Sequence, residues 1–265
     1  MRVPQHLVDR RREELRGLIR RDGFLPVAEI CRRQGVSEAT ARRDLVAIEA
    51  GGHITRTRGG ALADYNATFA SLGERATRAR TAKGRIAAAA ARLIPDASTV
   101  FLDAGTTVLQ LARLIRVNPM PLRVFTNGLL IAQEFLNVPN LQVSVLGGQL
   151  RSENASFVGP QAEAVLEGLW FDQLFLGVSC IGLDGSIYSA DSAEANLNRR
   201  MLPRSAQSHV LADSSKFGAM ATYKVAPLKA VTQVVTDSGV APDWRHKLDK
   251  LGVTLCVVPI AGEAA

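Results

Sequence analysis

Seven short apolar segments recur between residues 98 and 259, and they constrain the fold more than any other feature of the chain. The segments are STVFLDAGTT, LRVFTNG, LQVSVLGG, DQLFLGVS, SHVLADSS, AVTQVVTD and TLCVVP. Helix-like stretches separate most of them, as in VLQLARLI, LLIAQEFL and AEANLNRRML, and the alanine-rich GRIAAAAARLI precedes the first. Apolar strands that alternate with helices favour a mostly parallel, Rossmann-like α/β sheet.

The N-terminal part has a different pattern, which predicts three helices and a hairpin. The first helix spans residues 9–21, and the second begins after Pro26, a residue favoured in the first helical turn, and ends at Gly35. Ser37 is a candidate N-cap for the third helix, which runs toward Glu49. The sequence HITRTRGGALA then predicts a short β-hairpin, because β-branched residues precede a double glycine. This order of elements is typical of a winged helix-turn-helix.

The third predicted helix carries two adjacent arginines within GVSEATARRDL, residues 35–45. At about 100° per residue, Ala41, Leu45 and Ile48 fall on one stripe facing a small core, and Arg43 lies nearly opposite. Such a helix fits the major groove of DNA, where arginine binds guanine edges or phosphates. An arginine-rich surface helix is the alternative for the pair alone, and the order of elements favours DNA binding. The predicted DNA-binding residues are Ser37, Glu38, Thr40, Arg42 and Arg43 of the helix and Arg56 and Arg58 of the hairpin.

The positive charge is concentrated in the N-terminal part of the chain. Residues 1–62 contain 13 Arg against 8 Asp and Glu, a net charge of +5, whereas residues 63–265 contain 19 Lys and Arg against 17 Asp and Glu, a net charge of +2. This distribution suggests a polyanion-binding module, with a solvated basic surface as the alternative from charge alone. We therefore expect a DNA-binding domain at 1–62, a linker at 63–82 and a sensor domain at 83–265.

The composition indicates a folded protein with two domains. A length of 265 residues and a hydrophobic content of 47% support at least one sizeable core. No apolar run approaches the ~20 residues of a membrane span, and the first residues lack the apolar stretch of a secretion signal. Cys31, Cys180 and Cys256 lie far apart without metal-ligand spacing. We expect reduced thiols in a cytoplasmic protein without a metal site, a cofactor or a membrane partner.

The carboxyl ends of the predicted strands carry candidate ligand-binding residues, because ligands of open α/β sheets bind there. The segment DAGTT, residues 103–107, directly precedes a helix, so its backbone N–H groups and Thr hydroxyls offer an anion site. Lys216 of DSSK would neutralise a phosphate, whereas Asp103 and Glu194 would accept hydrogen bonds from sugar hydroxyls. A pocket for a small phosphorylated polyol follows from this combination.

Some of these residues also have plainer interpretations. The double glycine at 147–148 is as consistent with an ordinary turn as with a binding loop, and DSSK is compatible with a loop whose lysine is solvated. The candidate effector-binding residues are Asp103, Gly105, Thr106, Thr107, Thr126, Asn127, Gly128, Gly147, Gly148, Glu194 and Lys216.

Several short motifs occur in both halves of the chain in a set order. GVSEATARRDL is followed by RTRGGAL, and LDAGTT, VFTNG, VLGGQLR, FVGPQAE, FLGVSCIGLDG, LADSSKFG and VVTD come later. With these motifs the chain resembles the DeoR family of bacterial regulators. The resemblance implies a winged helix-turn-helix joined to a sensor domain related to ribose-5-phosphate isomerase and the CoA transferases. It further implies a repressor of sugar or polyol catabolism genes, active as a dimer or tetramer, that a phosphorylated sugar or polyol releases from double-stranded operator DNA.

A phosphosugar isomerase-like enzyme with a DNA-binding appendage is the alternative function. Asp103, Glu194 or Lys216 would then act as acid or base, because isomerisation requires a base placed near a carbon-bound proton. The sequence contains no paired acids beyond those that the ligand itself would use, and its four histidines are scattered. We therefore expect no enzymatic activity and no catalytic residues.

Overall fold

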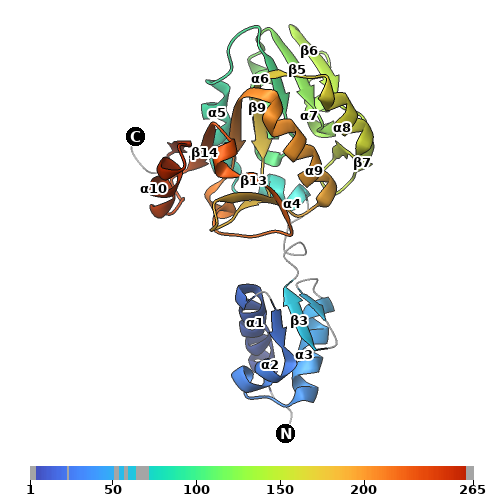
Figure 1. The fold of residues 1–265 in the computed structure, drawn as a ribbon, viewed down its shortest axis with the longest axis vertical. Helices are drawn as coiled ribbons and strands as arrows, with labels where there is room; N and C mark the ends of the chain where they lie inside the picture. Colours follow the sequence, from blue (N-terminus) through green and yellow to red (C-terminus); the bar gives the residue numbers. More distant parts are fainter. Residues whose placement is uncertain (1–3, 23, 51–53, 57–58, 64–71, 261–265) are drawn as a thin grey trace. The chain divides into compact units, whose positions relative to one another are not determined.

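The chain folds as two compact units, residues 1–69 and residues 70–265 (Figure 1). The predicted boundary, a linker at 63–82, stays a prediction, and the helix α4 (Leu72–Thr77) lies within that segment. The computed structural model describes most of the chain, namely residues 4–22, 24–50, 54–56, 59–63 and 72–260.

The described part of the N-terminal unit has the predicted order of helices and hairpin. Its elements are α1 (Gln5–Asp22), β1 (Phe24–Pro26), α2 (Val27–Gln34), α3 (Glu38–Ala50), β2 (Ile54–Arg56) and β3 (Gly60–Ala63). Ala41, Leu45 and Ile48 of α3 are 0%, 2% and 1% exposed, so the predicted apolar stripe is confirmed. They pack with residues of α1 and α2 in one core.

The hairpin strands β2 and β3 pair in antiparallel register as predicted, and β1 adds a third strand that the sequence pattern did not predict. The strand order is β1-β3-β2, with Leu25 of β1 opposite Ala61 of β3. Leu25 is buried, which explains why a segment of only three residues joins the sheet. A Cβ on Gly60 would collide with the carbonyl oxygen of Leu25, so the close approach of β1 and β3 requires glycine at this position.

All seven predicted apolar segments form strands of one parallel sheet in the C-terminal unit. The strand order is β15-β14-β12-β9-β4-β5-β6, and every adjacent pair is parallel. The predicted α/β fold class is thereby confirmed. The strands are β4 (Thr99–Leu102), β5 (Leu122–Thr126), β6 (Leu141–Val145), β9 (Phe171–Gly177), β12 (Ser205–Leu211), β14 (Gln233–Asp237) and β15 (Thr254–Val258).

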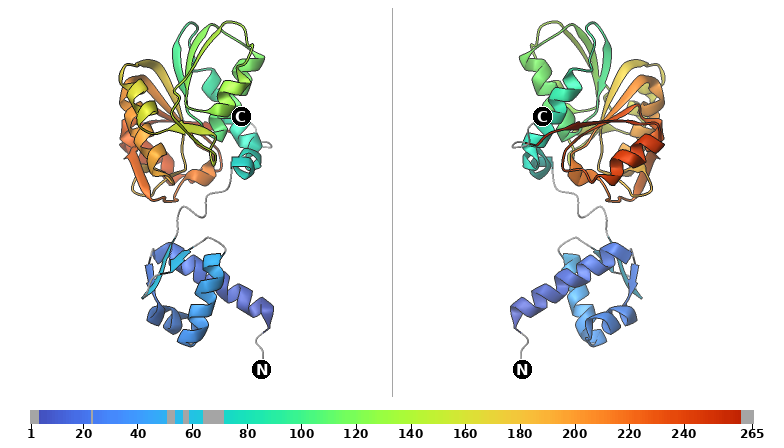
Figure 2. Two further views of the ribbon diagram at one scale, coloured as in Figure 1. Left: turned by 90° about the vertical axis from the view of Figure 1, so that its right-hand side faces the viewer. Right: turned by 90° about the vertical axis from the view of Figure 1, so that its left-hand side faces the viewer.

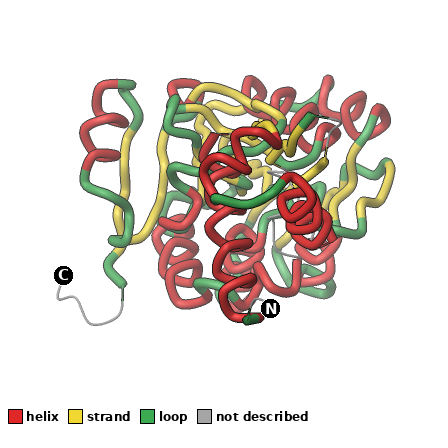
Figure 3. The backbone as a smooth tube through the Cα atoms, turned by 90° about the horizontal axis from the view of Figure 1, so that it is seen from below, coloured by secondary structure: helices red, strands yellow, loops and turns green. Residues whose placement is uncertain are grey.

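Helices cover both faces of this sheet, so its central strands are apolar on both sides (Figure 2). In β4, for example, Val100 and Leu102 belong to one core and Phe101 to the other. The first core is covered by α5 (Arg80–Ala91), α6 (Thr106–Val117) and α7 (Leu129–Glu134), and the second by α8 (Pro160–Glu167), α9 (Ser192–Met201) and α10 (Asp243–Lys250). The strand β15 forms the edge nearest the C-terminus (Figure 3).

Smaller elements lie outside the main sheet. The hairpin β7 (Gln149–Arg151) and β8 (Ser156–Val158) is antiparallel. A second antiparallel sheet has the order β10-β11-β13. Its strands are β10 (Cys180–Ile181), β11 (Ser186–Ser189) and β13 (Tyr223–Pro227). The short 3-10 helices are η1 (Leu202–Arg204), η2 (Ser214–Lys216) and η3 (Leu228–Ala230).

Candidate functional site

The outward face of α3 presents the two predicted arginines. Arg42 and Arg43 are exposed, in agreement with the prediction that they point away from the core. Arg43 donates from Nε to the carbonyl oxygen of Ala39 at 3.2 Å, and Arg42 forms an ion pair with Glu38 at 2.6 Å. Because both arginines bond only within their own exposed helix face among the described contacts, their guanidinium groups stay available to an incoming polyanion.

The beginning of α3 is organised by Ser37. Its hydroxyl accepts a hydrogen bond from the Thr40 N–H at 3.3 Å and lies 3.0 Å from the Thr40 hydroxyl. This is the capping arrangement expected for a helix N-terminus, where free N–H groups also favour phosphate. Arg56 of β2 is exposed and pairs with Glu49, whereas Arg58 lies outside the described residues.

A buried carboxylate fixes α3 against α1. Asp44, which is 2% exposed, accepts hydrogen bonds from Nε of Arg11 at 2.7 Å and from Nε of Arg12 at 2.9 Å. Two guanidinium groups therefore compensate the buried charge. No role was predicted for Asp44, although its spacing of three residues from Ala41 and four from Ile48 places it on the inner side of the helix.

In the C-terminal unit, the chain direction across the sheet reverses between β4 and β9. The strands β4, β5 and β6 extend the sheet to one side, and β9, β12, β14 and β15 extend it to the other. Ligands of open α/β sheets bind at such a switch point, beyond the carboxyl ends of the strands. Asp103 follows β4 and accepts a hydrogen bond from the N–H of Gly177, the last residue of β9, at 3.1 Å.

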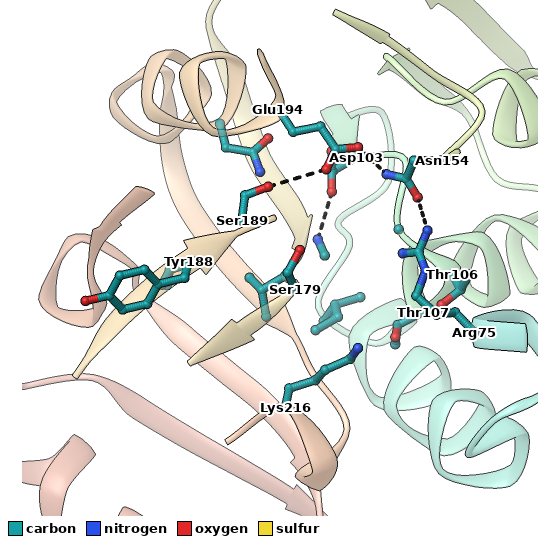
Figure 4. A pocket seen from close by; sticks show the side chains of 16 residues that line it. Arg75, Asp103, Thr106, Thr107, Asn154, Ser179, Tyr188, Ser189, Glu194 and Lys216 are labelled. Carbon is teal, nitrogen blue, oxygen red and sulfur yellow. Dashed lines mark hydrogen bonds between the residues drawn. The ribbon is translucent and has the colours of Figure 1, made fainter. Parts of the chain in front are cut away.

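A polar pocket of about 560 Å³, counting the space at its mouth, opens at this switch point. Six of the predicted effector-binding residues line it, namely Asp103, Gly105, Thr106, Thr107, Glu194 and Lys216. In Figure 4, Lys216 points toward the N-terminus of α6, where Thr106 and Thr107 lie, and the carboxylates gather at the opposite end. The pocket therefore combines groups for an anion with groups for hydroxyls.

The carboxylate end is built around Asp103 and Glu194. Burial, and to a lesser degree the neighbouring carboxylate of Glu194, raises the pKa of Asp103 to about 7. Glu194 Oε1 accepts hydrogen bonds from Arg151 at 2.9 Å, from Asn154 at 2.6 Å and from Ser156 at 3.2 Å. Its other oxygen, Oε2, lies 3.5 Å from the Ser189 hydroxyl. Glu194 is thus held in place while one oxygen keeps capacity to accept from a ligand hydroxyl.

The cationic end contains two positively charged side chains with perturbed pKa values. Burial lowers the pKa of Lys216, and the nearby Asp213 carboxylate opposes this effect. Burial is also the main cause of the lowered pKa of Arg75. A phosphate near these groups would relieve the cost of burying two like charges, for which the main compensating carboxylate is Asp213 at Lys216 and Glu194 at Arg75.

Five predicted effector residues do not line this pocket, although the structure describes all of them. The Thr126 hydroxyl donates to the Leu102 carbonyl oxygen at 2.6 Å, and Asn127 Oδ1 accepts from the Ala104 N–H at 3.1 Å. Gly128 lines a smaller apolar pocket beside α6. Gly147 and Gly148 have φ values of 50° and 106°, typical of a turn. These residues shape the backbone around the site, and a contact with the effector stays a prediction for each.

Several lining residues were not predicted from the sequence. Those with polar side chains are Arg75, Asn154, Ser179, Tyr188, Ser189 and Asn198. Arg75 lies in the segment interpreted as a linker, and Asn154 lies in the turn of the β7–β8 hairpin, which the sequence pattern did not distinguish. The motif VLGGQLR contains Arg151, the partner of Glu194. The charge of Arg151 was therefore a feature of the sequence that could have indicated this part of the site.

Among the described residues, no helix is long and apolar enough to cross a membrane. No group of three His, Cys, Asp or Glu side chains in the described part of the chain is arranged to hold a metal ion.

A helix-turn-helix unit with an exposed arginine face, joined to an α/β unit with a polar ligand pocket, defines a ligand-responsive DNA-binding protein. Family comparison agrees with this class: residues 11–66 match the DeoR-like helix-turn-helix domain, and residues 78–238 match the DeoR C terminal sensor domain. The chain belongs to the DeoR family of transcriptional regulators.

Named relatives span almost the whole chain. It is 34% identical over 251 residues to the putative aga operon transcriptional repressor of Escherichia coli O157:H7, covering 94% of this chain and 93% of that protein. It is 33% identical over 234 residues to the lactose phosphotransferase system repressor of Streptococcus mutans, covering 86% and 92%. Among solved structures, ribose 5-phosphate isomerase A of Methanocaldococcus jannaschii matches with 14% identity and a TM-score of 0.37, covering 51% of this chain and 53% of that one.

Proposed function

We propose that this regulator represses genes for the use of a sugar or polyol and that a phosphorylated sugar or polyol releases it from operator DNA. The names of its relatives, which refer to the aga operon and to a lactose phosphotransferase system, support a sugar-related role. The observation that carries the proposal is the pocket itself. It places the N-terminus of α6 and Lys216 opposite the carboxylates of Asp103 and Glu194.

The chemistry of the two ends explains why the ligand should carry both a phosphate and hydroxyls. A helix N-terminus and an ammonium group favour a phosphate, because free N–H groups and positive charge meet there. Carboxylate oxygens accept hydrogen bonds and therefore favour hydroxyl groups. Unphosphorylated sugars would leave Lys216 and the N-terminus of α6 without an anionic partner and should bind much more weakly.

Calorimetry tests this proposal with matched ligand pairs. We expect glycerol 3-phosphate, ribose 5-phosphate or glucose 6-phosphate to bind, and glycerol, ribose and glucose not to bind. Equal affinity for a sugar and its phosphate would contradict the proposal. A thermal shift is a suitable first screen, because a ligand at 100 times its dissociation constant stabilises the folded state by about 2.7 kcal/mol.

Release from DNA is tested with an operator obtained by selection of wild-type protein on a random-sequence DNA pool. Asp103→Ala and Lys216→Ala variants should still bind this operator and should no longer dissociate when the phosphorylated ligand is added. A melting curve for each variant separates this outcome from simple destabilisation. Normal folding together with normal release in both variants would remove Asp103 and Lys216 from the binding site.

We also propose that the pocket binds its ligand without turning it over and that the active form is a dimer or tetramer. The relatives named above are repressors, which supports a regulatory pocket over an isomerase. Conversion of ribose 5-phosphate above the level of a Lys216→Ala control would favour the enzyme instead. Light scattering of the purified protein measures the oligomeric state, and a monomer at working concentration would contradict that part of the proposal.

A further inference from the structure

The short helix α4 is the first described element of the C-terminal unit, and only residues 64–71 separate it from β3. Whatever changes the docking of α4 therefore acts directly on the segment that leads to the DNA-binding unit. One side chain of α4, that of Arg75, reaches the ligand pocket (Figure 4). The helix α4 therefore follows the DNA-binding unit in the chain, and its Arg75 side chain lines the ligand pocket of the C-terminal unit.

The amide side chain of Asn154 connects Arg75 to the carboxylate end of the pocket. Its guanidinium group donates to Asn154 Oδ1 at 2.7 Å, and Asn154 Nδ2 donates to Glu194 Oε1 at 2.6 Å (Figure 4). The amide uses its acceptor toward Arg75 and its donor toward Glu194. Asn154 therefore joins α4 to α9 across the pocket.

The far end of this connection is fixed. Glu194 forms an ion pair with Arg151 at 2.9 Å, and its N–H donates to Asp191, the N-cap of α9, at 2.9 Å. The Asp191 carboxylate also pairs with Arg151, at 3.1 Å. Because Glu194 is held from several sides, it is a fixed anchor for the Asn154 bridge.

Further contacts dock α4 on the body of the C-terminal unit. Lys83 of α5, which is 2% exposed, donates from Nζ to the carbonyl oxygens of Arg75 and Arg78. Leu72 lines the smaller apolar pocket together with Leu130 and Ile131. Of these attachments, only the Arg75 side chain reaches the main pocket, so it is the one that a ligand would alter.

We propose that Arg75 is an effector-binding residue, that Asn154 is its positioning residue, and that the Arg75–Asn154–Glu194 connection transmits effector binding to α4 and so to DNA affinity. This inference rests on the proposed function. A ligand hydroxyl on Glu194 and a ligand phosphate beside Arg75 act on both ends of the Asn154 bridge. The free energy of ligand binding then depends on how α4 is docked, which is the condition for coupling between two sites.

Operator binding measured by fluorescence anisotropy tests the inference. The ratio of operator dissociation constants with and without saturating glycerol 3-phosphate, ribose 5-phosphate or glucose 6-phosphate gives the coupling. Wild-type protein should show a ratio of about 5 to 150 for the compound that binds. In Asn154→Ala and Arg75→Ala the ratio should fall below about 2, a loss of most of that coupling.

Two further variants separate the connection from simple loss of a pocket residue. Asn154→Asp still accepts from Arg75 but cannot donate to Glu194, so it should lose the coupling as Asn154→Ala does. Asn198→Ala is the matched control, because Asn198 lines the pocket from α9 and lies outside the Arg75–Asn154–Glu194 connection. It should weaken effector binding and keep the wild-type ratio at saturation.

The possible results distinguish failure of the proposed function from failure of the connection alone. A wild-type ratio near 1 with all three compounds would overturn the proposed function and this connection with it. A normal wild-type ratio that persists in Asn154→Ala and Arg75→Ala would overturn the connection alone. Deuterium exchange of residues 72–77 in wild-type protein gives a measurement that needs no variant: unchanged exchange on effector binding would also overturn it.

Discussion

Gly105 and Gly177 approach each other so closely that a Cβ atom at either position would crowd the opposite backbone. A Cβ on Gly177 would lie 2.9 Å from the Gly105 α-carbon, and a Cβ on Gly105 would lie 3.0 Å from the Gly177 α-carbon. Gly105 follows β4, and Gly177 is the last residue of the neighbouring strand β9. Their contact brings the carboxyl ends of these strands together, and both glycines line the pocket at the switch point of the sheet.

Gly177→Ala should therefore disturb the pocket and the sheet together. We expect a loss of about 1–3 kcal/mol in the free energy of unfolding, because the opposing atoms are backbone and cannot move aside cheaply. Effector affinity should fall in the same variant, since Asp103 Oδ2 would lie 3.3 Å from the new Cβ. Chemical denaturation and calorimetry measure the two effects.

Gly84→Ala provides the control for this substitution. Gly84 lies in α5, and a methyl group at this position would meet nothing within 4 Å. Alanine is favoured over glycine inside a helix by up to about 1 kcal/mol, so this variant should be as stable as wild type or more stable. Equal stability of Gly177→Ala and wild type would show that the strand ends are not tightly apposed.

The raised pKa of Asp103 predicts a pH dependence of stability. Its pKa rises from 3.8 in the unfolded chain to about 7, so the folded state binds the proton more tightly. This contribution to stability is fully present below pH 3.8 and is lost as the pH rises through about 7; its upper bound is about 4 kcal/mol. Asp103→Asn removes this titration and keeps the shape. The difference in unfolding free energy, variant minus wild type, should therefore increase between pH 4 and pH 8.

Effector affinity should also depend on the protonation of Asp103, but it should rise with pH where this contribution to stability falls. The ionised form accepts hydrogen bonds from ligand hydroxyls, so affinity should rise as Asp103 loses its proton near pH 7. Calorimetry across this range in wild type and Asp103→Asn measures the effect after correction for the phosphate's own ionisation. A wild-type pH profile that Asp103→Asn reproduces would exclude Asp103 as the titrating group.

The strands of the main sheet could be predicted because most of them, the central ones above all, contain short apolar runs. Residues such as Phe101 and Leu102 are buried on opposite faces of the same sheet, and this double burial leaves an unmistakable pattern. The apolar stripe of α3 was predictable for a similar reason, since Ala41, Leu45 and Ile48 repeat with helical spacing. Burial of one face of a helix, or of both faces of a strand, produces a pattern of apolar residues that is visible in the local sequence.

The pocket was only partly predictable because its residues come from irregular segments. Arg75 lies among Ala, Thr and Arg residues without apolar periodicity, and Asn154 is placed by the docking of a short hairpin. Thr126 and Asn127 illustrate the converse difficulty. Their side chains satisfy buried backbone groups of Leu102 and Ala104, a task that uses the same residue types as ligand binding does.

Removal of the Asp44 carboxylate should loosen α3 from α1. Asp44→Ala leaves Arg11 and Arg12 without their partner, and the side chains of these arginines are only 19% and 30% exposed. We expect a local loss of up to about 3 kcal/mol in opening free energy, because an uncompensated charge remains partly buried. Hydrogen exchange of α1 and α3 in the full chain measures it.

The ion pair between Glu38 and Arg42 provides the comparison for Asp44. Both side chains are more than half exposed, so Glu38→Ala should change the same opening free energy by less than about 1 kcal/mol. If Asp44→Ala had no larger effect than Glu38→Ala, the buried carboxylate would not be what holds α3 in place.

Arg42 and Arg43 should determine operator recognition from the exposed face of α3. Arg42→Ala and Arg43→Ala should each cost about 1–3 kcal/mol of operator binding where the side chain contacts a base, and the fold should persist because neither side chain enters the core. Footprinting and anisotropy on the selected operator and on scrambled DNA measure the loss and its sequence dependence.

Arg56 should behave differently, because it lies on the wing strand β2 and not on α3. Arg56→Ala should weaken binding to operator and scrambled DNA alike and reduce the dependence of affinity on salt, as expected for a phosphate contact. Its pairing with Glu49 predicts that Glu49→Gln raises overall DNA affinity by freeing the guanidinium group. If the footprints of Arg42→Ala and Arg43→Ala matched that of wild type, another surface of the N-terminal unit would recognise the operator.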